Sequence, residues 1–403
     1  MSDSKKKVPK RRFEEFSNAN DWEQRKLDSI FKKIRNAFVG TATPYYVDSG
    51  HFYLESNNIK NGEINRNTEV FINDEFYNKQ SNKLLHTDDI VMVQSGHVGH
   101  TAVIPEELDG TAAHALIMFT DYKDETNPYF LNYQFQTHKS KRKLDTITTG
   151  NTIKHILSSE MKEFIVECPS VEEQQKIGTF FKQLNSTIAL HQRKLEKIKA
   201  LKTAYLSEMY PAEGESKPKR RFAGFTDDWE QRKLGEVVQI TMGQSPNGTN
   251  YTENPNDYIL VQGNADMKNG QVVPRIWTKQ ITKTAAIGDI ILSVRAPVGD
   301  VGKTNYNVVL GRGVAGIKGD EFIYQVLFKM RLENYWAKYS TGSTFESINS
   351  NDLKEAKVFV PKELEKKEIG IFFKQLDNTI TLHQRKLKKL QNIKKAYLNE
   401  MFI

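Results

Sequence analysis

Residues 166–210 read VECPSVEEQQKIGTFFKQLNSTIALHQRKLEKIKALKTAYLSEMY, and residues 358–402 read VFVPKELEKKEIGIFFKQLDNTITLHQRKLKKLQNIKKAYLNEMF. The second stretch follows the first at a constant offset of 192 residues, without gaps, and more than half of the paired positions are identical. Self-similarity at one fixed spacing is the signature of a duplicated structural unit. The chain is therefore expected to contain one long element twice.

Each copy carries apolar side chains at alternating spacings of four and three residues over about five heptads, which is the pattern of a coiled-coil seam. Lys, Arg, Glu and Gln fill most other positions, and these residues favour helix. A helix of about 38 residues would be about 57 Å long at a rise of about 1.5 Å per residue. The residues predicted to form the seam are Ile177, Phe181, Leu184, Ile188, His191, Leu195, Ile198 and Tyr205 in the first helix, and Ile369, Phe373, Leu376, Ile380, His383, Leu387, Leu390 and Tyr397 in the second.

Two polar residues interrupt the stripe at equivalent places, His191 with His383 and Lys202 with Lys394. Polar seam residues fix the register and the number of partner helices at some cost in stability. A metal site or a proton relay at the histidines is the alternative. Because both helices belong to one chain, we expect them to pack against each other as a rigid strut, with a coiled coil between two chains as the alternative.

A second repeat precedes the variable parts of the chain. Residues 9–27 read PKRRFEEFSNANDWEQRKL, and residues 218–234 read PKRRFAGFTDDWEQRKL, the same segment shortened by two residues. We call these the lead segments. The linker YPAEGESKP at 210–218 is rich in proline, glycine and charge, which marks a boundary between units. Each unit is expected to run from a lead segment through a variable body to a long helix, and two such units can close on each other with pseudo-two-fold symmetry.

The variable bodies, residues 28–165 and 235–357, are diverged copies of one template. Short β-branched runs such as IVMV at 90–93 are bounded by Gly, Asn, Asp and Pro, which indicates strands and turns. Residues 321–339 have the amphipathic spacing of a helix. The predicted fold class is α+β, with two globular bodies joined by two long helices. The predicted domain boundaries are 1–165 and 211–357 for the bodies with their lead segments, and 166–210 and 358–403 for the helices.

Length, charge and cysteine usage narrow the class of protein. A chain of 403 residues is long enough for two or more domains, and its net charge of +8 favours an anionic partner, either nucleic acid or an acidic protein. The single Cys168 excludes a disulfide framework and a cysteine zinc site, and it suits a reducing cytoplasm. No apolar run approaches the roughly 18 residues that span a membrane, and no signal peptide is expected.

The sequence carries no complete motif of the catalytic classes considered below. GDVGKT at 299–304 resembles a phosphate-binding loop, but Pro297 occupies the place of its first glycine and a strand-like run follows it. No glycine-rich dinucleotide fingerprint occurs. His97 and His100 could hold a metal, but further ligands at a useful spacing are missing. We therefore predict no catalytic residue, no metal site and no cofactor bound by this chain, and we do not expect the chain alone to be an enzyme.

Nucleic-acid binding has more support from the loops of the bodies. Lys and Arg hold phosphates, and Asn, Gln, Ser and Thr read base edges, although a solvated surface is an equal alternative for any single lysine. Both bodies keep a T-G-x-T motif, which suits either a phosphate or a turn that caps the following helix. The candidate DNA-contacting residues are Gln94, Ser95, His97, Lys139, Lys141, Arg142, Lys143, Thr149, Gly150, Asn151 and Thr152 in the first body, and Gln244, Ser245, Lys279, Arg295, Lys303, Arg312, Thr341, Gly342, Ser343 and Thr344 in the second.

The order of these parts resembles the specificity subunit of a Type I restriction–modification system over essentially the whole chain. The resemblance rests on the duplicated order of variable body and long helix, on the lead segment PKRRF…DWEQRKL, and on the skeleton of the bodies. No single motif carries it. The residues themselves also leave open a different class, a coiled-coil adaptor whose basic bodies bind protein.

The resemblance implies a division of labour. Each body would be a target recognition domain that reads one half of a split, asymmetric sequence in double-stranded DNA. The two helices would form an antiparallel coiled coil that sets the spacing between the half-sites. Two methyltransferase subunits would methylate adenine with S-adenosylmethionine, and two motor-nuclease restriction subunits would use ATP and Mg²⁺. The chain would act in the cytoplasm, without contact to a membrane.

Overall fold

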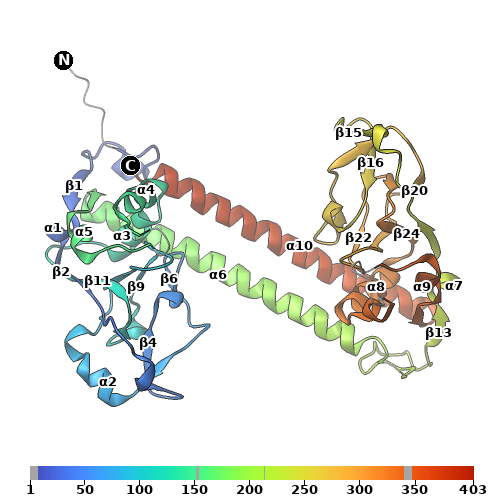
Figure 1. Cartoon of the computed structure of the whole chain (residues 1–403), viewed down its shortest axis with the longest axis horizontal. Coiled ribbons are helices and arrows are strands. Elements are labelled where there is room, and N and C mark those ends of the chain that lie inside the picture. Colours follow the sequence, from blue (N-terminus) through green and yellow to red (C-terminus); the bar gives the residue numbers. More distant parts are fainter. Residues whose placement is uncertain (1–7, 151–153, 213, 340–346) are drawn as a thin grey trace. The chain divides into compact units, whose positions relative to one another are not determined.

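The computed structural model describes residues 8–150, 154–212, 214–339 and 347–403 (Figure 1). The chain forms two compact units. Unit 1 comprises Met1–His191 together with Leu387–Ile403, and unit 2 comprises Gln192–Lys386. Each unit therefore contains one body and about half of each long helix, so that neither unit is a continuous stretch of the sequence.

The two long helices are α6 (Val171–Glu208) and α10 (Glu363–Glu400), each of 38 residues. Within unit 1 the ring of Phe180 packs on that of Tyr397 with centroids 5.4 Å apart, and within unit 2 Tyr205 packs on Phe372 at 5.3 Å. In each unit the first half of one long helix thus packs on the last half of the other, which is the arrangement of the predicted antiparallel coiled coil. None of the sixteen predicted seam residues is exposed.

The expected helical ranges began too early. Residues Ile165–Cys168 form strand β12, and Lys357–Val360 form strand β25, so helix is wrong for the first residues of both ranges. A proline disfavours helical backbone in the residue before it, and Pro169 and Pro361 follow these strands directly. Each helix consequently begins two residues after its proline.

The first lead segment holds the ends of both long helices in unit 1. The backbone N–H of Arg11 donates to the carbonyl of Glu400 at the end of α10 (2.8 Å), and their side chains form an ion pair of 2.7 Å. Arg12 donates two hydrogen bonds to the carboxylate of Glu173 at the start of α6, of 2.7 and 2.6 Å. The Glu173 side chain is fully buried, so this pair is part of the core of the unit.

The second lead segment repeats these contacts in unit 2. Arg220 pairs with Glu208 at the end of α6 through its backbone (2.8 Å) and its side chain (2.6 Å). Arg221 donates two hydrogen bonds to the buried carboxylate of Glu365 at the start of α10, of 2.6 and 2.8 Å. The lead segments are therefore connectors that bind the end of one long helix to the start of the other.

Both cores contain the tryptophan of the lead segment. Trp22 packs on Phe130 and Phe402 in unit 1, with ring centroids 5.5 and 6.1 Å apart. Trp229 packs in the same way on Phe322 and Tyr210 in unit 2, at 5.6 and 5.8 Å. The repeated DWEQRKL sequence therefore supplies the same aromatic centre to both units.

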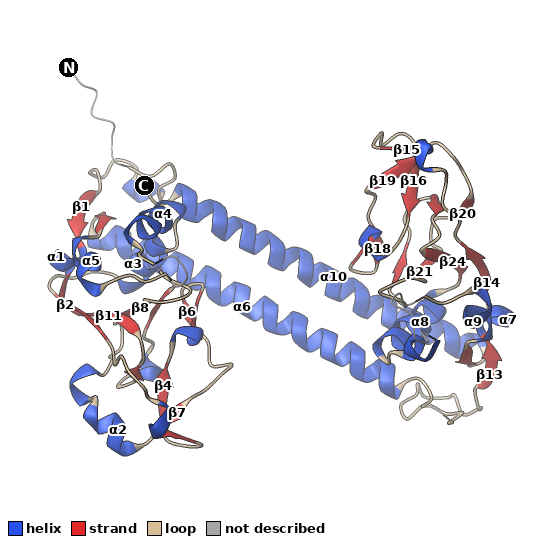
Figure 2. Ribbon diagram, in the orientation of Figure 1, coloured by secondary structure: helices blue, strands red, loops and turns tan. Residues whose placement is uncertain are grey.

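The body of unit 1 is built on an antiparallel sheet of order β2-β11-β8-β9, with a smaller sheet of order β10-β4-β7-β3 (Figure 2). Alternate residues of a strand face opposite sides of its sheet. Ile90 and Met92 of β8 therefore join the core around Trp22, whereas Val91 and Val93 join a second core on the other face. The strands are β1 Glu23–Lys26, β2 Phe31–Asn36, β3 Tyr46–Val47, β4 His51–Leu54, β5 Ile59–Lys60, β6 Glu63–Ile64, β7 Phe71–Ile72, β8 Ile90–Val93, β9 Thr101–Val103, β10 Ala112–Ala113, β11 Leu116–Tyr122 and β12 Ile165–Cys168; the helices of the body are α1 Leu27–Ile30, α2 Asp74–Lys79, α3 Pro128–Phe135, α4 His138–Ile147 and α5 Ser158–Glu163.

The body of unit 2 has the same plan with longer sheets, of order β14-β24-β21-β22-β18-β17 and β15-β19-β16-β23-β20. Ile290 and Leu292 of the central strand β21 face the core around Trp229, and Ile291 faces the second core. The strands are β13 Glu230–Lys233, β14 Gln239–Met242, β15 Tyr251–Thr252, β16 Tyr258–Val261, β17 Met267–Lys268, β18 Gln271–Val272, β19 Ile276–Thr278, β20 Lys283–Ala285, β21 Ile290–Ser293, β22 Val301–Lys303, β23 Val308–Leu310, β24 Val314–Lys318 and β25 Lys357–Val360; the helices are α7 Leu234–Val237, α8 Glu321–Leu332 and α9 Ser350–Glu355.

Each body begins and ends at one two-stranded ladder. Antiparallel β1 and β12 pair Lys26 with Ile165, and β13 and β25 pair Lys233 with Lys357. The chain therefore leaves and returns to the long helices at a single place in each unit. This geometry confirms the α+β class with two bodies and two helices, whereas the domain boundaries themselves remain a prediction.

The helix expected over 321–339 is shorter than predicted. Helix α8 ends at Leu332, and a 3-10 turn covers Tyr335–Tyr339. Asn334 between them has a positive φ of 52°, a conformation that ends a helix and that asparagine tolerates better than most residues. Within the described residues, no helix is both long enough and apolar enough to cross a bilayer.

Candidate DNA-binding interface

The two bodies carry equivalent loops after their central strands, residues 94–100 after β8 and 294–300 after β21. In unit 1 the Gln94 carbonyl accepts from the N–H of Ile156 at 3.0 Å, and in unit 2 the Val294 carbonyl accepts from Ile348 at 3.0 Å. The segment that follows each T-G-x-T motif is thus fixed against the loop. In both units the structure therefore brings the segment after the motif to the loop that follows the central strand.

The T-G-x-T motifs do not cap the helices that follow them. Thr149 and His155 exchange two backbone hydrogen bonds, so Thr149 is paired with the segment that follows the motif. Helices α5 and α9 begin several residues later, after Leu157 and Asn349 respectively. The remaining predicted motif residues, Asn151, Thr152, Thr341, Gly342, Ser343 and Thr344, lie outside the described residues.

Two lysines predicted to contact DNA are used inside unit 1. Lys139 and Lys143 on α4 form ion pairs of 2.7 and 3.2 Å with Glu167 of β12, whose side chain is 3% exposed. A buried carboxylate needs such partners, because an unpaired buried charge is costly. We therefore assign these two lysines to the attachment of α4 to β12.

Of the other basic residues predicted to contact DNA in unit 1, His97 lies in the loop of residues 94–100 and Lys141 lies near its last residue, His100. His97, Lys141 and Arg142 are exposed. Burial lowers the pKa of His100, and the charges of Lys141 and His97 lower it further, which places these groups close together. Ser95 is held at this loop by a 2.6 Å hydrogen bond between its Oγ and Nδ1 of His155.

Unit 2 has a hollow of about 260 Å³ at the equivalent place. It is lined by three predicted residues, Ser245, Arg295 and Arg312, and by two that sequence reasoning missed, Gln262 and Asn264. They come from loops next to four strands. Strands β14, β24 and β21 are neighbours in one sheet, and β16 belongs to the other sheet. The stretch QGN at 262–264 was visible in the sequence, but nothing there indicated that it would meet Arg295 and Arg312.

Gln244 and Lys279 lie outside this hollow. Both residues are exposed. The carbonyl of Gln244 accepts from the Thr282 hydroxyl at 2.6 Å, and the N–H of Lys279 donates to the carbonyl of Asn250 at 3.0 Å. Their backbones are thus held in ordered loops, while their side chains remain available at the surface.

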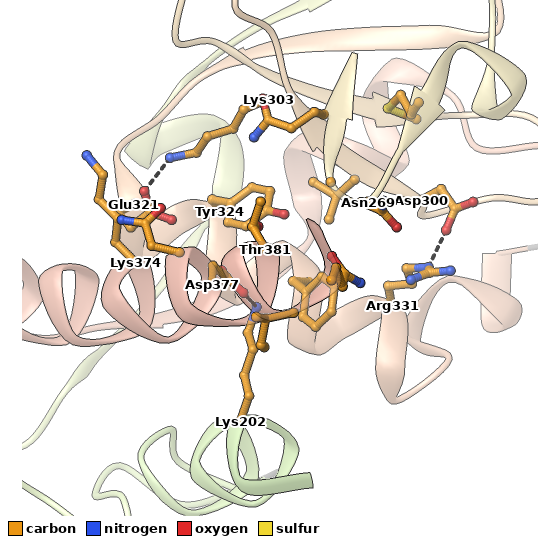
Figure 3. Close-up of a pocket in the computed structure, with 18 of the residues that line it drawn as sticks. Lys202, Asn269, Asp300, Lys303, Glu321, Tyr324, Arg331, Lys374, Asp377 and Thr381 are labelled. Carbon is orange, nitrogen blue, oxygen red and sulfur yellow. Dashed lines mark hydrogen bonds and ion pairs between the residues drawn. The ribbon is translucent and has the colours of Figure 1, made fainter. Parts of the chain in front are cut away.

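Lys303, also predicted to contact DNA, belongs to a larger groove in unit 2, of about 740 Å³ (Figure 3). Lys303 forms a 2.6 Å ion pair with Glu321, and Arg331 forms one with Asp300 across the same groove. These pairs neutralise most of the charge that the body presents there. The residues of the body therefore add little net charge to the groove, whereas Arg295 and Arg312 line the hollow without a carboxylate.

The two seam lysines have different environments although the helices repeat. In unit 2, Lys202 forms a 2.6 Å ion pair with Asp377, and its ammonium lies 4.0 Å from the centroid of the Phe328 ring (Figure 3). In unit 1, Lys394 donates to the amide oxygen of Gln136 at 3.3 Å. Asn185 stands where the repeat places Asp377. Burial lowers the pKa of Lys394 to about 8.

This difference predicts a pH effect on unit 1. Because the folded chain binds the Lys394 proton less tightly than the unfolded chain does, its stability should rise as the pH increases from about 8 towards 10.5. Asn185→Asp supplies the carboxylate found in unit 2, so it should raise the Lys394 pKa and reduce this rise; burial still lowers the pKa of Lys202 beside Asp377, so the rise should not vanish. Urea unfolding of both chains between pH 7 and 10 measures the difference.

The matched control is Asp377→Asn, which removes the carboxylate from Lys202. It should lower the Lys202 pKa further and make the stability of unit 2 rise more steeply with pH. Identical pH profiles for the wild type and Asn185→Asp would contradict this account of Lys394.

Metal binding was the alternative for the seam histidines His191 and His383, and it was also considered for His97 and His100. The His97 and His100 rings have centroids 6.1 Å apart. In the part of the chain that the structure describes, no group of three or more His, Cys, Asp or Glu residues is arranged to hold a metal ion.

The fold and the loops together define a protein with two related bodies joined by two long helices. The loops of the two bodies carry different polar side chains. The sequence profile of the family described as "Type I restriction modification DNA specificity domain" matches residues 19–200 and 226–392. The two matches cover more than half of the chain. The chain therefore belongs to this family, and the resemblance noted in the sequence is confirmed.

Individual relatives agree with this assignment. The chain is 26% identical over 399 residues to a curated type I restriction enzyme specificity subunit (MjaX) of Methanocaldococcus jannaschii, covering 94% of this chain and 92% of that protein. Its fold is similar to the crystal structure of the Type-I restriction-modification system S subunit from M. genitalium, with a TM-score of 0.66, 15% identity and coverage of 98% and 99%. It is also similar to a chain from a structure described as the basis of complex assembly and conformational transition of the type I R-M system, with a TM-score of 0.54, 20% identity and coverage of 94% and 97%.

Proposed function

We propose that this specificity subunit reads a split, asymmetric target in double-stranded DNA, one half with each body. The observation that carries the proposal is the contrast between repeated and unrepeated parts. The lead segments and long helices are closely similar in sequence in the two units, and both cores are built around the lead-segment tryptophan, whereas the loops beside the central strands present different side chains. One scaffold with two different reading surfaces suits a target with two different halves.

The positive charge of the loops supports DNA as the ligand. His97, Lys141 and Arg142 in unit 1, and Lys279, Arg295 and Arg312 in unit 2, form the proposed contact surfaces. Lysine and arginine contacts to phosphates would supply most of the affinity, and amide and guanidinium contacts to base edges would supply the specificity. Lys139, Lys143 and Lys303 are left out of this set because they already form ion pairs with carboxylates of the same unit.

The long helices would set the distance between the half-sites and carry the partner subunits. We expect two methyltransferase subunits, which bind S-adenosylmethionine and methylate adenine, and two restriction subunits, which use ATP and Mg²⁺. The chain itself would contribute no catalytic group. The relative described with the complex assembly of a type I R-M system supports association with such partners.

Salt dependence separates DNA recognition from the adaptor alternative. The chain, purified with its methyltransferase partner, should bind duplex DNA with an affinity that falls steeply as salt rises, because binding releases counterions from the phosphates. Fluorescence anisotropy between about 50 and 200 mM salt measures the slope. Binding that is independent of salt, or absent for DNA and present for an acidic protein, would favour the adaptor.

A further inference from the structure

The hollow of unit 2 contains two arginines whose charge is not used within the chain. Among the described residues, neither Arg295 nor Arg312 has a side-chain hydrogen bond or an ion pair. Other arginines of the unit are used internally: Arg220 with Glu208, Arg221 with Glu365, Arg275 with Asp266 and Arg331 with Asp300. Two guanidinium groups that line one hollow without a carboxylate among the lining residues favour an electronegative ligand.

The backbone around Arg312 is fixed although its side chain is exposed. Its N–H donates to the Ser245 hydroxyl at 3.2 Å. Gly313, which follows it, lies so close to the segment after β16 that an added Cβ would be 2.0 Å from the carbonyl oxygen of Gln262. The backbone at Gly313 therefore packs tightly against residue 262. This contact fixes the position of the Arg312 backbone on the wall of the hollow.

Arg295 and the opposite wall are fixed as well. The Arg295 carbonyl accepts from the hydroxyl of Ser293 at 2.9 Å, and its backbone pairs with Ser347. On the opposite wall, the buried carboxylate of Asp266 accepts from the N–H groups of Gln262 and Gly263, at 2.7 and 3.2 Å. A site whose walls are preorganised loses less entropy when a ligand binds.

The lining groups match a base edge better than a lone phosphate. A phosphate needs only positive charge and donors, which surface lysines supply. The hollow adds the amides of Gln262 and Asn264, which carry both donors and acceptors. Arginine donating two hydrogen bonds to O6 and N7 of guanine is the commonest specific contact in the major groove.

We propose that Arg295 and Arg312 read guanine in the half-site recognised by residues 235–357. This inference rests on the proposed DNA recognition and adds to it the base and the residues that read it. Asp266 acts as a positioning residue, because its hydrogen bonds shape the wall that carries Gln262.

The equivalent place in unit 1 lacks this pair of arginines. Ser95 occupies the position of Arg295. Each of them directly follows the residue whose backbone carbonyl accepts a hydrogen bond from the segment after the T-G-x-T motif. His114 occupies the position of Arg312, two residues before β11. His114 Nε2 bonds to the carbonyl oxygen of Gly40 (2.9 Å), and Ser95 bonds to His155. Guanine reading by an arginine pair is therefore a property of the second body.

The experiment maps adenine methylation by the full chain with its methyltransferase partner in cells that lack other adenine methylation. Arg312→Gln and Arg295→Gln are compared with the wild type, and Arg232→Gln is the control, because Arg232 lies exposed on β13 at the base of the body. We expect each hollow variant to relax selection at a guanine of one half-site by about 5- to 150-fold, the discrimination of one bidentate contact. The control should leave the motif unchanged.

A binding assay with the purified complex tests the contact atom. Replacing the guanine by 7-deazaguanine removes the N7 acceptor, so it should weaken binding by the wild type and have little further effect on the variant of the arginine that reads this base.

Three results would overturn the inference. The first is a half-site for the second body without a G·C pair. The second is an unchanged motif in both variants. The third is equal weakening of binding to all sequences with a salt slope smaller by about 1, which indicates a phosphate contact. In each case, a split motif obtained with the wild-type chain would still support the proposed function. If the wild-type chain gave no motif at all, the proposed function itself would be contradicted.

Discussion

Exchanging residues 235–357 for the second body of another specificity subunit is expected to replace one half of the methylated motif completely and to leave the other half unchanged. The structural reason is the base of the body. Strands β13 and β25 pair Lys233 directly with Lys357, so the exchanged segment begins and ends at adjacent points of one ladder. The core around Trp229 and the two long helices contribute residues from outside the exchanged range.

The matching exchange of residues 28–165 should change the other half only, because β1 and β12 close the first body in the same way. Methylation maps of both exchanged chains, made with the same methyltransferase subunit, measure the result. A change in both halves after one exchange would contradict the assignment of one body to one half-site. A change in the gap between the halves would show that the bodies also determine the spacing.

Glu365→Ala is expected to destabilise unit 2 by about 3–5 kcal/mol, the typical cost of breaking a buried ion pair. The Glu365 side chain is 1% exposed and accepts both hydrogen bonds from Arg221, which is itself only 14% exposed. Alanine would leave this guanidinium in a largely buried place without its carboxylate. The loss should also free the start of α10 from the lead segment.

Glu208→Ala is the matched control for this prediction. It removes the neighbouring pair with Arg220, whose side chains are 57% and 38% exposed, and exposed pairs contribute only about 0.2–1 kcal/mol. Urea unfolding of the full chain, followed by tryptophan fluorescence and far-UV circular dichroism, gives both values. Equal losses for the two variants would contradict the view that the Arg221–Glu365 pair holds the unit together.

The repeated elements could be predicted well because their pattern is local. A stripe at spacings of four and three residues specifies a helix wherever it occurs, and the constant offset of 192 residues reveals the duplication without any structure. The lead segments were also recognised as a repeat. Their contacts were not predicted, because Arg12 meets Glu173 and Arg221 meets Glu365 across more than 140 residues of chain.

The candidate site was predicted only in part because strand order brings distant loops together. Ser245, Arg295 and Arg312 lie close together because β24 lies between β14 and β21 in the sheet. In the sequence, β24 follows both of them. Gln262 joins them from the second sheet, which no local signal indicated.

The basic cluster before the first T-G-x-T motif was predicted to contact DNA, but part of it forms ion pairs within the chain. Lys139 and Lys143 look like a surface cluster in the sequence, but the fold places Glu167 beside them. Charge clusters can be counted in a sequence, whereas the partners that neutralise them follow from the packing of α4 on β12.

The central claim is that this chain determines a split DNA target for a methyltransferase. The most direct measurement is a methylation map of cells that lack other adenine methylation and that express this chain with the methyltransferase subunit encoded beside it, read by modification-sensitive long-read sequencing. The account predicts one motif with two different halves separated by a fixed gap, and no such motif when this chain is omitted. A copurifying complex that methylates no motif, or a motif that persists without this chain, would contradict it.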